Sequence, residues 1–80
     1  MSVSKHNALR AALDHLEKGE WDAAHKIVQS DDSPAACWVH GIVHVMEGDL
    51  DNARYWYSRA KRAFSEDLAT ELAAVKKMLP

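Results

Sequence analysis

The chain has 80 residues, 10 Lys and Arg against 12 Asp and Glu, a formal charge of −2 and one cysteine. This length allows one domain with a small core, and the charge balance excludes a strongly basic nucleic-acid-binding surface. A single cysteine forms no internal disulfide, and we see neither a secretory leader nor an apolar run of the ~20 residues that a membrane helix needs, so we expect a cytoplasmic domain over residues 1–80.

Apolar residues at helical spacing predict two helices in the first third of the chain. The first, over about 6–18, carries a stripe of leucines and stops at Gly19, a residue that suits the left-handed end of a helix. The second, over about 20–29, has acidic residues in its first turn, which complement the positive end of the helix dipole. A polar turn at 30–33 follows.

Three further helices are expected in the remainder of the chain. Pro34 after a serine is typical of a helix start and predicts a third helix over about 34–47. The fourth is expected over about 50–64, and the fifth over about 66–79 with Ser65 as its cap. Because no alternating apolar run or hairpin turn indicates a strand, the predicted fold class is all-α with five helices.

The chain repeats itself weakly with a period of 29 residues. Gly19 matches Gly48 and Ala24 matches Ala53 at this spacing. A fixed period with two helices per unit is typical of helical repeat proteins. We therefore expect repeat units over about 6–30 and 34–64, each a helix-turn-helix hairpin, followed by a capping helix that covers the last apolar face.

The second unit resembles a tetratricopeptide repeat. Small residues at Gly41, Ala53 and Ala60 allow two helices to approach closely, and Tyr57 fills the space between them. Residues 38–57 are also similar to a group of small uncharacterised bacterial proteins with a W-x-H-x3-H-x2-E-G-D-x2-N-A-x-Y-W-Y run. The resemblance implies a right-handed stack of two helical hairpins with a C-terminal capping helix, and it implies no established activity.

Two histidines and an acid share one side of the predicted third helix. His40, His44 and Glu47 fall within an arc of about 60°, taking ~100° per residue, and Cys37 borders that arc. These donors suit zinc or another transition metal, which would make the protein a metal-binding or hydrolytic one. The zinc-protease motif H-E-x-x-H is absent, because glycine follows His40. We favour the alternative that the histidines are buried, hydrogen-bonded core residues and that the protein has no cofactor.

Two groups of side chains are candidates for binding a partner. The first is the other side of the third helix, which is apolar and consists of Trp38, Ile42, Val45 and Met46. This surface suits a peptide, an amphipathic helix or a second copy of the chain, unless the fifth helix covers it. The second group lies on the fourth helix and consists of Tyr55, Trp56 and Arg59. These residues are typical either of anchors in a protein interface or of a solvated basic face.

A small interaction module is the function that these features favour. An enzyme is disfavoured, because the three glycines lie too far apart for a phosphate-binding loop and no nucleophile elbow is present. Residues 1–51 carry four Lys and Arg against nine Asp and Glu, whereas residues 52–80 carry six against three. This asymmetry suits contact between copies as well as ordinary solvated faces. We expect a protein or peptide partner or a homodimer, and neither nucleic acid nor a membrane.

Overall fold

In a computed structural model, which describes residues 5–79, the chain forms five helices and these residues contain no strand. The predicted all-α class is therefore confirmed. Residues 1–4 and Pro80, which the predicted domain includes, lie outside the described residues. The helices are α1 (Lys5–Glu17), α2 (Trp21–Val28), α3 (Pro34–Glu47), α4 (Leu50–Arg59) and α5 (Leu68–Met78).

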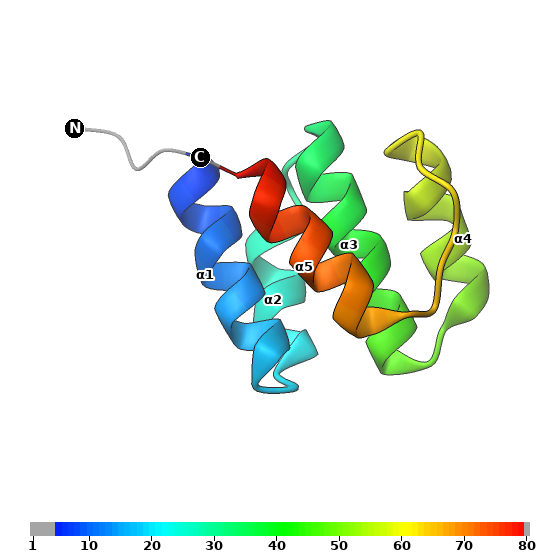
Figure 1. Ribbon diagram of the computed structural model, residues 1–80, viewed down its shortest axis with the longest axis horizontal. Helices are drawn as coiled ribbons and strands as arrows, with labels where there is room; N and C mark the ends of the chain where they lie inside the picture. The colour runs from blue at the N-terminus through cyan, green and yellow to red at the C-terminus, as the bar shows by residue number, and fades with distance from the viewer. Residues whose placement is uncertain (1–4, 80) are drawn as a thin grey trace.

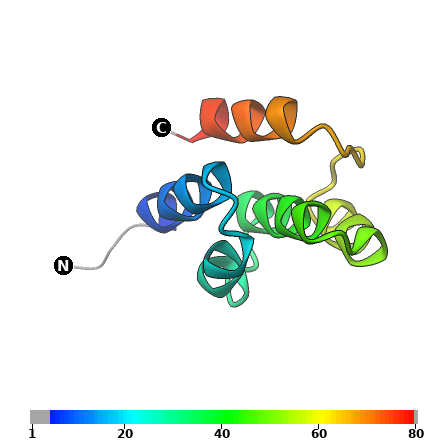
Figure 2. The ribbon, with the colours of Figure 1, turned by 90° about the horizontal axis from the view of Figure 1, so that it is seen from below.

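The helices form two hairpins, α1 with α2 and α3 with α4, and α5 folds back over the first helix of each (Figure 1). Turned by 90°, α1, α3 and α4 follow one another in a row, with α2 on one side of the row and α5 on the other (Figure 2). Within the described chain, α5 packs against α1 and α3, and α4 packs against α3. The fifth helix thus covers the side shared by α1 and α3.

The two hairpins turn in the same way at equivalent positions of the 29-residue period. Gly19 and Gly48 have left-handed backbones, with φ of 77° and 94°. In each turn, the amide of the residue after the glycine donates to the carbonyl of a histidine five residues earlier, His15 at 2.8 Å and His44 at 2.9 Å. A side chain would strain this backbone, so glycine determines where both helices stop.

Close approach of α3 and α4 depends on Gly41, as its small size predicts. A Cβ atom at Gly41 would lie 2.5 Å and 2.8 Å from two ring carbons of Tyr57 and 3.4 Å from the Ala53 carbonyl oxygen. Tyr57 is 1% exposed and Ala53 is fully buried. The space that a side chain would take at Gly41 is therefore filled by the tyrosine ring.

A carboxylate on α5 connects that helix to the α3–α4 hairpin. One oxygen of Glu71 accepts hydrogen bonds from Trp38 Nε1 at 3.1 Å and from the Tyr57 hydroxyl at 2.9 Å. Burial and the bond to Glu71 raise the pKa of Tyr57 above its usual range. Lys76 also pairs with Glu17 of α1, so α5 is held at both ends of its length.

The fourth helix ends earlier than the sequence predicts, at Arg59 instead of about residue 64. Lys61 has a positive φ of 59°. The Arg62 amide donates to the Tyr57 carbonyl at 3.1 Å, in the same type of turn that follows the two glycines. Because lysine rarely adopts this backbone, nothing in the sequence marks the stop.

The fifth helix begins two residues later than predicted, at Leu68, and its cap is Asp67 instead of Ser65. The Asp67 carboxylate accepts hydrogen bonds from both the amide and the hydroxyl of Thr70, at 3.2 Å and 2.8 Å. Ser65 instead accepts a bond from the Asp67 amide at 3.1 Å. An aspartate that receives two bonds from the first turn is the stronger N-cap. None of the helices in residues 5–79 has the length and apolarity needed to cross a bilayer.

Candidate functional site

Three imidazole rings meet between α2 and α3. His25 comes from α2, and His40 and His44 lie one turn apart on α3. The ring centroids are 4.7 Å apart for His25 and His40, 5.3 Å for His25 and His44, and 5.0 Å for His40 and His44. One nitrogen of each ring lies within 4.8 Å of those of the other two. We call these three residues the histidine cluster.

The histidine cluster is buried at its base and partly open at His25. His40 and His44 are 3% and 6% exposed, whereas His25 is half-buried. His44 Nδ1 lies 2.7 Å from Glu47 Oε1. A carboxylate oxygen accepts in such a contact and the imidazole N–H donates. Glu47 thereby fixes the orientation of the His44 ring.

His40 has an unmet hydrogen-bonding requirement. Within the described part of the chain, its Nδ1 is the one buried side-chain nitrogen or oxygen without a hydrogen-bond partner. Burial, together with the nearby His44, His25 and Arg59, lowers the pKa of His40 to about 4. The ring is therefore neutral at pH 7. A buried polar atom without a partner costs ~1–3 kcal/mol.

The histidine cluster contacts a second group of side chains through Trp56. The His40 and Trp56 rings are stacked, with centroids 3.8 Å apart and an angle of 10° between their planes. The Arg59 guanidinium lies 5.0 Å from the centroid of the Trp56 ring and 5.9 Å from that of Tyr55. We call Tyr55, Trp56 and Arg59 the α4 outer face. The same indole thus touches the buried cluster and this surface.

The structure gathers the predicted metal ligands differently from the sequence pattern. His40 and His44 do come together, but Glu47 is the hydrogen-bond partner of His44, and the third imidazole is His25. His25 is not among the ligands that the helical spacing of α3 predicts, because it belongs to another helix; the sequence signal for it is the helical line that it shares with Trp21 and Gln29. Cys37 takes no part: its buried thiol approaches the Asp32 carbonyl at 3.7 Å, and burial raises its pKa.

The predicted apolar groove on α3 is covered by α5. Trp38 is 2% exposed and Ile42 is fully buried. Val45 and Met46 are half-buried and pack against the core. The fifth helix packs on α3 and contacts Trp38 through Glu71, and none of the four residues is exposed, so they present no open groove.

The α4 outer face, in contrast, is accessible. Tyr55 is 54% exposed, Arg59 is exposed and Trp56 is half-buried. The Arg59 guanidinium reaches the Tyr55 hydroxyl at 3.5 Å and the Asp32 carboxylate at 3.5 Å. Two further arginines near this helix lie over aromatic rings, with Arg54 4.2 Å from Phe64 and Arg62 3.4 Å from Trp38.

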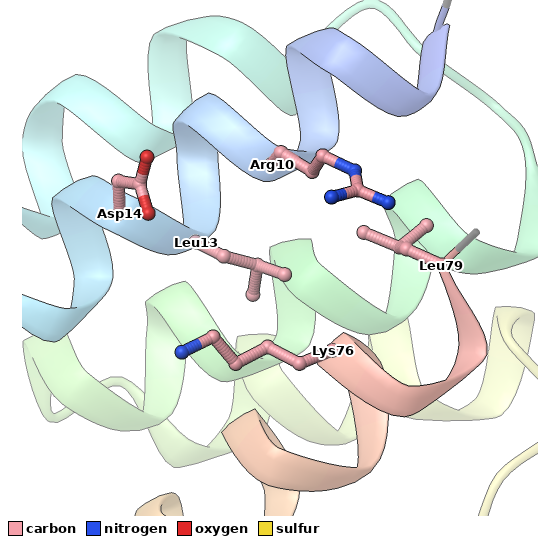
Figure 3. Close-up of a pocket in the computed structure, with 5 residues that line it drawn as sticks. All are labelled: Arg10, Leu13, Asp14, Lys76 and Leu79. Carbon is pink, nitrogen blue, oxygen red and sulfur yellow. The ribbon is translucent and has the colours of Figure 1, made fainter.

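A shallow pocket lies between α1 and α5 (Figure 3). Its volume is about 220 Å³, and it is lined by Arg10, Leu13, Asp14, Lys76 and Leu79. Leu13 and Leu79 form its apolar part, and the charged side chains come from both helices. This volume is below the ~300–1,000 Å³ of typical ligand pockets, and the pocket contains none of the residues that the sequence singled out.

Comparison of the chain with protein-family models, with curated proteins and with solved structures gives no match. The resemblance of residues 41–60 to a tetratricopeptide repeat and that of residues 38–57 to the small bacterial proteins therefore stay predictions.

Proposed function

We propose that the protein is a small interaction module with a tetratricopeptide-like scaffold, and that the α4 outer face binds an acidic segment of a partner protein. The observation that carries this proposal is the exposure of Tyr55 beside Arg59 on a helix whose backbone, among residues 5–79, lies close to that of no helix other than α3. The apolar surface that would compete for this role, on the other side of α3, is occupied by α5. The repeated glycine turns at Gly19 and Gly48 support the scaffold.

The residues of the α4 outer face suit a protein contact. Tyrosine, tryptophan and arginine are the residues on which interface energy concentrates, because they bury a large area and lose little conformational freedom. Arg59 is already ordered by its contacts with Trp56 and Tyr55, so less entropy is lost when a partner binds. A guanidinium lying on an aromatic ring keeps N–H groups at its edge for a carboxylate.

Charge determines the kind of partner that this surface suits. Residues 52–80 have three more basic than acidic residues, the difference between six and three. Arg59 pairs with Asp32, but Asp32 belongs to the α2–α3 loop and its side chain is 83% exposed. Such an exposed pair is weak, so a partner carboxylate can replace Asp32 at Arg59. Asp32 then acts as an internal competitor for the partner.

The proposal is tested with random twelve-residue peptides displayed on phage and selected on the purified protein. We expect selected peptides to be rich in Asp and Glu, and we measure their binding by fluorescence anisotropy at 50 and 150 mM salt. Tyr55→Ala and Arg59→Gln should each weaken binding about tenfold or more, as anchor residues do. Asp32→Asn should strengthen binding, because it removes the internal competitor. Lys26→Gln, an equal charge change on α2, is the matched control and should have little effect.

Two results would contradict the proposal. One is that the selected peptides bind Tyr55→Ala and Arg59→Gln as well as they bind the wild-type protein. The other is self-association through this surface. Light scattering at low micromolar concentration would then show a dimer that Arg59→Gln dissociates, and the α4 outer face would be a contact between two copies of the chain.

A further inference from the structure

We propose that His25, His40 and His44 bind a divalent late first-row transition-metal ion, with zinc as the first candidate, and that Glu47 orients His44 for this role. This site does not depend on the proposed peptide surface, although the Trp56 ring belongs to that surface and stacks on His40. Three observations support it: the convergence of the rings, the unpartnered nitrogen of His40 and the carboxylate on His44.

The spacing of the three rings is close to that of a metal site. With Zn–N bonds of ~2.0–2.1 Å, nitrogens in a tetrahedral site are about 3.3 Å apart. The three candidate nitrogens all lie within 4.8 Å of one another. Binding an ion therefore requires the nitrogens to approach one another by up to about 1.5 Å, the difference between 4.8 Å and the ~3.3 Å of a tetrahedral site. Since His25 comes from α2 and the other two from α3, the ion would also link the two hairpins.

The chemistry of the donors selects the class of metal. Imidazole nitrogen suits zinc, copper and nickel, whereas calcium and magnesium prefer oxygen ligands. The site contributes three imidazole ligands, and a water molecule from the side of the half-buried His25 can take a fourth position. The residues therefore fit a zinc site with an open position, the type that three protein ligands form.

Glu47 occupies the place of a supporting residue. A histidine that binds a metal through one nitrogen usually donates its other N–H to a carboxylate or a carbonyl, which fixes the orientation of the ring. The 2.7 Å contact between His44 Nδ1 and Glu47 Oε1 already provides this arrangement. It explains why Glu47 lies beside the histidines without being one of the converging groups.

A competing set of donors shares His44 and consists of His44, Glu47 and Asp49. Both acids in this set are exposed and have other roles. Glu47 accepts from His44, and Asp49 caps α4 by accepting from the Asn52 amide at 3.3 Å. A structural role for these acids accounts for their positions, whereas no structural role accounts for the free His40 nitrogen.

The test uses full-length protein purified without a histidine tag. Zn²⁺ is added to chelator-treated protein, and bound metal is measured by equilibrium dialysis with elemental analysis. We expect one zinc ion per chain. We also expect Tm to rise roughly 10–20 °C when free zinc exceeds Kd a hundredfold, since this excess stabilises a domain of this size by ~2.7 kcal/mol. Parallel titrations with Cu²⁺ and Ni²⁺ identify the preferred ion, and Co²⁺ reports tetrahedral geometry through its visible absorption.

Variants assign the ligands. His25→Gln and His44→Gln should abolish stoichiometric binding, and Glu47→Gln should weaken it about 10–100-fold, as loss of a supporting carboxylate does. His25 is half-buried, so its variant is the one least exposed to folding defects, and circular dichroism checks every variant. His15→Gln is the matched control, because His15 also pairs with a glutamate, Glu20, at 2.7 Å outside the cluster; it should bind as the wild type does.

Three outcomes would overturn the inference. The first is that the wild-type protein shows saturable binding of none of Zn²⁺, Cu²⁺ and Ni²⁺. The second is binding that His25→Gln and His44→Gln leave unchanged. The third is binding that survives in His25→Gln and is lost in Asp49→Asn, which would assign the ion to the acidic set on His44.

Discussion

Replacing Gly41 by alanine tests whether the approach of α3 and α4 depends on this one missing side chain. Position 41 is inside α3, where glycine is the poorer helix former. On helix propensity alone, Gly41→Ala would stabilise the protein by about 0.8–1.0 kcal/mol. Packing predicts the opposite sign, and the sign of the measured change decides between the two.

The magnitude follows from the geometry around Tyr57. The added Cβ would lie 2.5 Å from one ring carbon, whereas carbon atoms in favourable contact are ~3.5–4.0 Å apart, so the ring or the helix must move by about 1 Å. The ring cannot withdraw freely, because its hydroxyl donates to Glu71 at 2.9 Å and it packs edge-on against Phe64. Overpacking of this kind costs ~1–3 kcal/mol. After the propensity gain of about 0.8–1.0 kcal/mol is subtracted, we expect a net loss of up to about 2 kcal/mol.

The assay is urea unfolding followed by far-UV circular dichroism. For a domain of this size, the expected loss also lowers Tm by ~4–8 °C per kcal/mol. A double-mutant cycle with Tyr57→Leu isolates the contact, since Gly41→Ala should be neutral or stabilising once the ring is gone. If Gly41→Ala instead stabilises the protein with Tyr57 in place, the proposed reason for glycine at this position is refuted.

Two further predictions concern polar groups that the fold buries. Glu71→Ala should lower the free energy of unfolding in urea by about 2–4 kcal/mol, because it leaves the donors of Trp38 and Tyr57 unpaired. Glu71→Gln keeps an oxygen that accepts, so it should cost clearly less. Equal losses would show that the two hydrogen bonds do not hold α5 in place. Metal-free protein should lose stability as pH falls from about 6.5 towards 4, since the unfolded chain protonates His40 first. A shift of the His40 pKa from 6.5 to about 4 allows a loss of at most about 3 kcal/mol in the free energy of unfolding, and we expect about 1–2 kcal/mol after solvent screening. Urea unfolding at pH 7 and pH 5 measures this loss, which should be smaller in His40→Gln. An equal loss in the variant would assign the effect to other groups.

The sequence alone determined the helices that carry strong local signals. Ser33 with Pro34, and Gly48 with Asp49, mark the two ends of α3 and the start of α4, because capping and left-handed backbone depend on the residue itself. The end of α4 at Arg59, followed by the left-handed backbone of Lys61, was not predictable in this way. Lysine has no preference for a left-handed backbone, so the turn there is imposed by the packing of the surrounding chain.

The sequence also identified most residues of the candidate sites while leaving their environment open. Helical spacing placed His40 and His44 on one side of α3, and it placed Tyr55 and Arg59 together on α4, because spacing within one helix fixes which residues are neighbours. Helical spacing did not identify the third histidine of the cluster, His25. His25 belongs to another helix, and only the packing of α2 on α3 brings its ring within 4.7 Å of that of His40.

Tertiary structure alone decided which surfaces remain open. Trp38 and Tyr55 looked equally suitable as partner anchors, since both are large aromatic residues on helices. The fold places α5 over α3, where Glu71 receives the Trp38 indole N–H, and leaves Tyr55 54% exposed. Exposure depends on contacts between helices far apart in the sequence, and periodicity within a helix carries no information about them.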